Sequence, residues 1–138
     1  MKMKIELLTS DRDPMGAAIA DYFDKGKAAK LRVFSSQFDE DEIPVSQLFR
    51  TYDEMPVLEQ KALQLAEGKI LDCGAGSGCH ALALQVMNKQ VTAIDISPLS
   101  IEVMQKRGVK QVFHINLFDE NYLEKFDTLF HIDASIKA

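Results

Sequence analysis

The spacing of apolar residues divides the chain into two parts of different character. From residue 69 onward, short apolar runs alternate with segments of helical periodicity, which predicts strands at 69–73, 90–96, 109–115 and 127–132 and helices at 79–87 and 98–106. Strands that alternate with helices form right-handed crossovers and a parallel sheet. We therefore predict an α/β fold for this part of the chain.

Residues 1–68 have a weaker and more helical pattern. A short strand is predicted at 3–7, a helix from the Asp13–Pro14 cap to about Lys30, and an extended piece at 31–34. The acidic run at 39–42 is interpreted as a solvent-exposed loop.

Pro56 begins a second predicted helix that ends at Gly68, with one apolar face formed by Val57, Leu58, Ala62 and Leu65. We expect 1–68 to be an N-terminal helical segment that packs on the same domain as 69–138.

Composition limits the classes of protein that the chain can represent. Its 138 residues suffice for one domain, and the net charge of -5, with scattered lysines and arginines, argues against general nucleic-acid binding. The amino-terminal residues lack the apolar core of a signal peptide, and no apolar run reaches the roughly 18 residues of a membrane span, so we predict a cytoplasmic protein. Cys73 and Cys79 have neither redox-pair nor zinc-ligand spacing and are expected to be reduced. No metal site is predicted.

The most informative segment is a glycine-rich turn at 70–78, ILDCGAGSG, between a predicted strand and a predicted helix. Gly74, Gly76 and Gly78 occupy alternate positions. Glycine adopts positive φ readily, and its lack of a Cβ lets a ligand approach the backbone closely. The helix that follows directs unpaired N–H groups at the same place, which favours an electronegative group there.

Asp95 ends the next predicted strand, where a carboxylate can accept hydrogen bonds from both hydroxyls of a ribose. Such charge-assisted bonds contribute roughly 1.5 to 3 kcal/mol each. In open parallel sheets, ligands bind beyond the carboxyl ends of the strands at the topological switch point, which is where the turn and Asp95 are expected to lie. A nucleoside-containing cofactor is therefore predicted.

The glycine spacing distinguishes between cofactors. A dinucleotide fingerprint requires G-x-G-x-x-G, whereas this turn is G-x-G-x-G with Cys79 in the last fingerprint place. Asp72 would also repel a pyrophosphate but could receive the ammonium group of an amino-acid moiety. A nicotinamide-dependent oxidoreductase is disfavoured on both grounds.

These residues resemble the motifs of the class I S-adenosylmethionine-dependent methyltransferases: 70–78 resembles the first motif, 91–97 the second, and 126–130 the start of the fourth strand. The resemblance implies a Rossmann-like three-layer sandwich with a mostly parallel sheet. It also implies that S-adenosylmethionine is the cofactor and S-adenosylhomocysteine the product. The methionine part would be held by Asp72 and the turn residues Gly74, Ala75, Gly76 and Gly78.

The same resemblance assigns the remaining cofactor contacts. Asp95 would bind the ribose hydroxyls, Ile96 would pack on the adenine, and Asn116 would contact the adenine amino group. Arg50, in a segment that in related enzymes closes over the cofactor, could pair with its carboxylate or could be a structural or exposed arginine. His80, His114 and His131 are interpreted as structural, and no catalytic residue is assigned.

The family sheet has seven strands, of which 69–138 would supply about four, so the expected fold is an incomplete one. The fourth strand would then be a sheet edge carrying Leu129, Phe130 and Ile132, to be covered by residues 3–7 or by self-association. Determinants for the methyl acceptor, which stays unknown, would lie largely outside these motifs. The alternative to a methyltransferase is a non-catalytic cofactor-binding or interaction module with the same fold.

Overall fold

The computed structural model describes residues 7–26, 31–35, 38–115 and 125–131. Most of the strand predicted at 3–7, together with Asn116 and Ile132, lies outside the described residues. Among the described residues, no helix is both long and apolar enough to cross a membrane.

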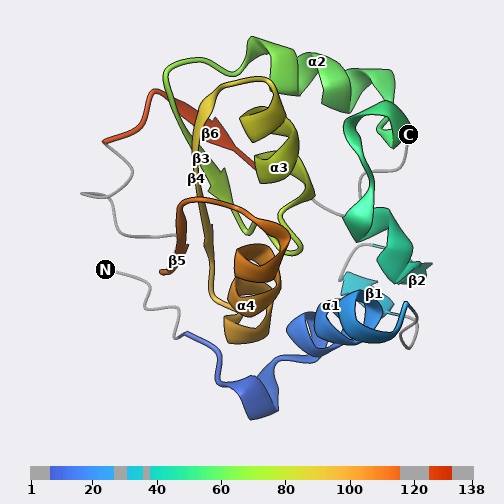
Figure 1. The fold of residues 1–138 in the computed structure, drawn as a ribbon. Helices are drawn as coiled ribbons and strands as arrows, with labels where there is room; N and C mark the ends of the chain where they lie inside the picture. Colours follow the sequence, from blue (N-terminus) through green and yellow to red (C-terminus); the bar gives the residue numbers. More distant parts are fainter. Residues whose placement is uncertain (1–6, 27–30, 36–37, 116–124, 132–138) are drawn as a thin grey trace, which may run out of the picture.

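A parallel four-stranded sheet lies along one side of α3 (Cys79–Val86) and α4 (Pro98–Arg107) (Figure 1). Its strands, in spatial order, are β5 (Val112–His114), β4 (Gln90–Asp95), β3 (Lys69–Cys73) and β6 (Thr128–Phe130). The order reverses at β3, because the chain moves from β3 to β4 and β5 on one side and returns to place β6 on the other side of β3. The predicted α/β class, with an incomplete Rossmann-like sheet, is confirmed.

Two helices cover one face of this sheet (Figure 1). They are α3 and α4, which connect consecutive parallel strands. The hydroxyl of Ser97 accepts a hydrogen bond from the Ser100 N–H at 3.0 Å and so caps α4. Gly108, with φ 96°, ends it.

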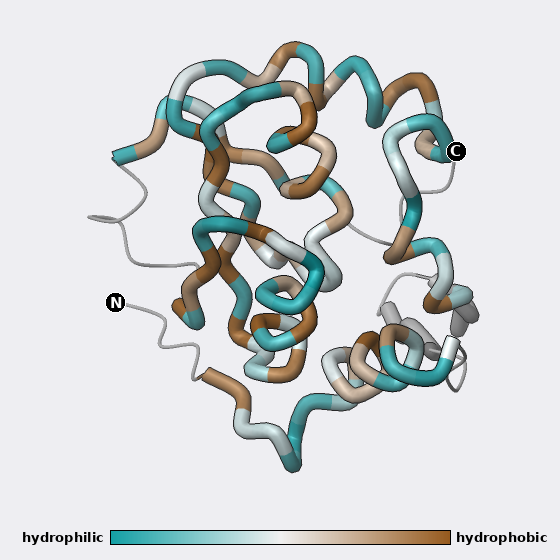
Figure 2. Tube along the Cα trace, in the orientation of Figure 1, coloured by the Kyte–Doolittle hydropathy of each residue, from teal (hydrophilic) through white to brown (hydrophobic). Residues whose placement is uncertain are grey.

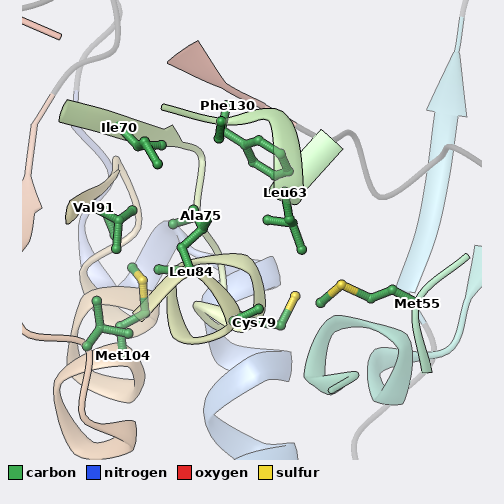
Figure 3. Packing of buried hydrophobic residues seen from close by; sticks show 14 of the residues in the cluster. Met55, Leu63, Ile70, Ala75, Cys79, Leu84, Val91, Met104 and Phe130 are labelled. Carbon is green, nitrogen blue, oxygen red and sulfur yellow. The ribbon is translucent and has the colours of Figure 1, made fainter. Parts of the chain in front are cut away.

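The principal core lies between the sheet and these helices (Figure 3). Ile70 and Val91 extend from the strands and pack with Leu84 of α3 and Met104 of α4, all nearly or fully buried. On the opposite face, a smaller buried cluster contains Leu71, Cys73 and Ile94. Burial of strand residues on both faces explains why these strands are continuous apolar runs.

The N-terminal part contains more strand than its sequence pattern predicts. Helix α1 (Pro14–Lys25) packs beside α4, and β1 (Leu31–Ser35) pairs in antiparallel fashion with β2 (Phe38–Ile43). The interpretation of 39–42 as a loop was wrong, because the backbone of this acidic run pairs with β1, Glu42 lying opposite Arg32. The predicted end of α1 at about Lys30 was also wrong, because Gly26 takes a left-handed conformation with φ 73° and ends the helix.

Two short 3-10 helices, η2 (Val45–Phe49) and η3 (Tyr52–Glu54), lead into α2 (Val57–Leu65). Helix α2 ends before the predicted Gly68, which has φ 66° and lies in the connection to β3. In Figure 2, α2 alternates between hydrophobic and hydrophilic residues along its turns.

The apolar face that periodicity assigns to α2 is not its buried face. Leu58 and Leu65 are 78% and 77% exposed and Val57 is also exposed, whereas Leu63 and the charged Glu59 are buried. The pattern was misleading because Glu59 forms an ion pair inside the protein, which places a carboxylate on the inward face.

Candidate functional site

The glycine-rich turn connects β3 to α3 at the carboxyl end of the sheet. Gly74, Gly76 and Gly78 have φ values of 63°, 59° and 82°, all in the left-handed region, and Gly78 is the N-cap of α3. The N–H of Ala75 donates to the carbonyl oxygen of Ile94 at 3.1 Å, which joins the turn to β4. Three left-handed residues in so short a segment require glycine.

The three glycines differ in their surroundings. A Cβ at Gly78 would lie 2.8 Å from Cγ of Met104, so this glycine is needed for packing within the core. A Cβ at Gly74 would lie 3.3 Å from Cε1 of His131, whereas at Gly76 the nearest atom, Cδ1 of Ile19, is 3.7 Å away. Gly76 therefore has the most open backbone of the three, and the ligand-approach argument applies best there.

Asp95 ends β4 beside this turn. Its Oδ2 accepts a hydrogen bond from the Gly76 N–H at 2.8 Å, and its Oδ1 accepts one from the Ser97 N–H at 2.9 Å. Burial raises the pKa of Asp95, and the hydrogen bonds from Gly76 and Ser97 act in the opposite direction. Each carboxylate oxygen has further acceptor capacity, so the group can bind donors from a ligand as well.

Asp72 lies in β3, two residues before Gly74, and is 2% exposed. Its Oδ2 has no hydrogen-bond partner within the described part of the chain. Burial, and secondly the charge of Asp95, raise the pKa of Asp72 to about 8, opposed by a backbone hydrogen bond from Ala81. The carboxyl is therefore largely protonated near neutral pH, and a cation placed beside it would favour its ionised form.

Two other predicted site residues, Ile96 and Arg50, make contacts within the protein itself. Ile96 follows Asp95 and is half-buried, and its carbonyl oxygen accepts from the Leu8 N–H at 3.1 Å. Arg50 donates from Nη2 to both carboxylate oxygens of Glu59, each at 3.1 Å, and from Nε to the carbonyl oxygen of Gln47 at 2.7 Å. Arg50 is thus part of an ion pair in this structure.

Glu59 also contacts His80, whose Nε2 lies 3.2 Å from Oε2 of Glu59. Burial lowers the pKa of His80, although its contact with Glu59 acts to raise it. The Arg50–Glu59–His80 network joins the N-terminal part to the first turn of α3. Arg50 and His80 lie 9 and 21 residues from Glu59 in the sequence, so no local sequence pattern predicts the network.

Asp13 has a second role that its local sequence does not indicate. As predicted, it caps α1, with Oδ1 accepting from the Gly16 N–H at 2.9 Å. Its Oδ2 also accepts from the Ser97 hydroxyl at 2.5 Å and from the Leu99 N–H at 3.2 Å. One buried carboxylate therefore caps α1 and contacts the first turn of α4, which fixes the N-terminal part beside Asp95.

Neither metal ligands nor reactive thiols are gathered at this site. The described residues contain no cluster of three or more histidine, cysteine or acidic side chains that could hold a metal ion. Cys73 and Cys79 are both buried and free, and burial raises the pKa of each thiol to about 11. A cavity of about 500 Å³ lies between α3, residues 50–53 and Arg107, and its lining includes Cys79, the first residue of α3.

Comparison with known proteins places this geometry in context. Residues 70–135 match the family model described as a methyltransferase domain. A solved S-adenosylmethionine-dependent methyltransferase from Bacteroides fragilis, in complex with S-adenosyl-L-homocysteine, is 66% identical with a TM-score of 0.78. The alignment covers 86% of this chain and 49% of that chain, so this chain spans about half the length of that protein.

Two curated relatives match shorter stretches. A bifunctional methyltransferase of Rickettsia bellii (strain RML369-C) is 35% identical over 74 residues, which cover 47% of this chain and 13% of the relative. A release factor glutamine methyltransferase of Flavobacterium psychrophilum is 38% identical over 69 residues, covering 49% of this chain and 24% of the relative. The matched stretches therefore cover a quarter or less of the length of these relatives.

Proposed function

We propose that this chain, which belongs to the class I S-adenosylmethionine-dependent methyltransferases, binds S-adenosylmethionine at the carboxyl ends of β3 and β4. One observation carries the proposal. Three left-handed glycines lie at the end of one parallel strand, and Asp95, at the end of the adjacent strand, contacts Gly76 directly. The order of the strands reverses at β3, and open α/β sheets bind nucleotide-like ligands beyond the carboxyl ends of the strands at such a switch point.

The residues present fit the cofactor. Asp72 has a buried oxygen without a partner, and an ammonium group would supply both the missing donor and a compensating charge. We assign this role to the amino group of the methionine moiety, which the backbone at Gly74, Ala75, Gly76 and Gly78 would also contact. Asp95 is assigned to the ribose hydroxyls.

The remaining contacts are proposed on the family resemblance. Ile96 would pack on the adenine and Asn116 would contact its amino group. Arg50 would reach the cofactor carboxylate only by exchanging its contacts with Glu59, so this assignment has the least support from the geometry. The B. fragilis neighbour supports the cofactor itself, since that protein is solved with S-adenosyl-L-homocysteine.

Methyl transfer is the activity we propose for the whole protein. When bound, S-adenosylmethionine supplies an electrophilic methyl group on its sulfonium. The residues assigned above would hold the methionine, ribose and adenine parts of the cofactor and so orient its methyl group, and proximity to an acceptor provides much of the rate in such reactions. The acceptor is unassigned. A cytoplasmic location is part of this proposal and is supported by the two free cysteines.

Titration calorimetry with the purified chain tests the choice of cofactor. We expect saturable binding of S-adenosylhomocysteine and no binding of NAD at the same concentrations. NAD is the informative control because both ligands contain adenosine and only NAD has a pyrophosphate, which the glycine spacing with Cys79 in the last fingerprint place disfavours. No heat with S-adenosylhomocysteine, or equal affinity for both ligands, would refute the proposal.

A further inference from the structure

Ser77, in the middle of the glycine-rich turn, is held from two sides by residues far away in the sequence. Its carbonyl oxygen accepts a hydrogen bond from Nη1 of Arg107 at 2.7 Å. Its hydroxyl donates to the carbonyl oxygen of Leu48 in η2. Ser77 is 2% exposed, so its end of each bond is shielded from water, while Leu48 and Arg107 are partly buried. These contacts act on the residue that lies between Gly76 and Gly78.

Arg107 also contacts the segment that supplies Leu48. Its guanidinium carbon lies 4.7 Å from the centroid of the Phe49 ring, and that ring packs against Tyr22 of α1 with 4.8 Å between centroids. Arg107 has no carboxylate partner in the described part of the chain. Its charge is therefore compensated by a carbonyl oxygen and an aromatic face, both of which belong to groups around the turn.

We propose that Arg107 is a positioning residue of the cofactor site. It fixes the carbonyl of Ser77 and seats η2 against the turn. The N–H of Gly76, the residue before Ser77, donates to Asp95, so a shift of Ser77 would displace the contact between the turn and the ribose-binding carboxylate. This inference rests on the proposed function, because it assigns Arg107 a role at that same site.

A simpler role for Arg107 is stabilisation of the helix dipole at the end of α4. Lys106 precedes it in the same last turn, is exposed, and offers the same charge without contact to Ser77. The pair Arg107→Met and Lys106→Met therefore separates the two roles. Methionine retains much of the aliphatic stem in each case and removes the charge and the donors.

The test combines S-adenosylhomocysteine calorimetry with amide hydrogen exchange in the absence of ligand. We expect Arg107→Met to raise Kd about tenfold, as for loss of a hydrogen bond to a charged group, and to accelerate exchange at 76–80 and 45–50. Arg107→Lys, which restores a cationic donor, should return Kd to within about threefold of the wild type. Lys106→Met should change neither measurement.

The two readouts distinguish failure of this inference from failure of the proposed function. If the wild type does not bind S-adenosylhomocysteine, the proposed function fails, and the proposal for Arg107 fails with it. If the wild type binds and folded Arg107→Met has wild-type Kd and exchange, the inference for Arg107 alone is overturned. If Arg107→Met does not fold, Phe49→Leu is the second variant, because it removes the aromatic ring against which the Arg107 guanidinium packs. We expect its Kd for S-adenosylhomocysteine to be several-fold higher than that of the wild type. An unchanged Kd would overturn the inference.

Discussion

Residues 69–107 and residues 7–68 contribute to the same site in different ways. The first region supplies most of the groups proposed to contact the ligand: the glycine-rich turn, Asp72 in β3 just before it, and Asp95 beside it. The second region supplies groups that hold this arrangement from outside: Asp13 on Ser97, and Leu48 on Ser77. The groups proposed to face the ligand are close together in the sequence, whereas the groups that support them come from distant positions, including Arg107 at the end of the first region.

The largest expected contrast between the regions concerns two left-handed glycines. At Gly78 a Cβ would lie 2.8 Å from Met104 and 2.9 Å from Val109, whereas at Gly26 it would have no neighbour within 4 Å. We expect Gly78→Ala to lower the free energy of unfolding by roughly 4 kcal/mol, through overpacking in addition to backbone strain. Gly26→Ala should cost about 1 kcal/mol, from strain alone.

Urea unfolding followed by circular dichroism measures this difference, since the chain has no tryptophan for fluorescence. Equal losses for the two glycine variants would show that the core around the turn is not packed as described.

A second contrast concerns the inward and outward faces of α2. Leu63 is fully buried and Leu58 is 78% exposed. We expect Leu63→Ala to lower the free energy of unfolding by about 3 kcal/mol and Leu58→Ala to change it by less than about 0.5 kcal/mol. The same denaturation experiment tests both, and a larger loss at Leu58 would restore the face that periodicity alone assigns to the helix.

A third contrast sets Asp72 against Asp13, two buried carboxyl groups. Asp13 receives three hydrogen bonds, whereas one oxygen of Asp72 has none in the described part of the chain. The pKa of Asp72 rises from 3.8 to about 8 on folding, so its protonated form stabilises the fold. That stabilisation is complete below pH 4, declines as the pH rises, and is lost above pH 8.

Asp72→Asn, which cannot ionise, isolates this effect. We expect the wild type to lose stability relative to Asp72→Asn as the pH rises. Its free energy of unfolding minus that of Asp72→Asn should decrease by about 1.4 kcal/mol per pH unit from pH 5 to pH 8. Denaturation at four pH values gives the slope. A difference that does not vary with pH would mean that Asp72 is ionised or solvated in the folded protein.

The groups proposed to face the ligand could be predicted from the sequence because their signals are local. Gly74, Gly76 and Gly78 are needed for backbone conformation, and alternating strands and helices place Asp95 beside them. The supporting contacts were missed because nothing near Ser77 in the sequence indicates Arg107, 30 residues further along. The buried face of α2 was misjudged for a related reason, since Glu59 is buried only because Arg50 and His80 compensate it.

The central claim, that Asp95 and the adjacent turn bind the cofactor, is tested most directly by the affinity of Asp95→Asn for S-adenosylhomocysteine. Glu102→Gln is the matched control, because it removes one negative charge from an exposed position of α4. We predict a Kd at least tenfold higher for Asp95→Asn, from weakened charge-assisted bonds to the ribose, and an unchanged Kd for Glu102→Gln. Wild-type affinity in folded Asp95→Asn would contradict the account.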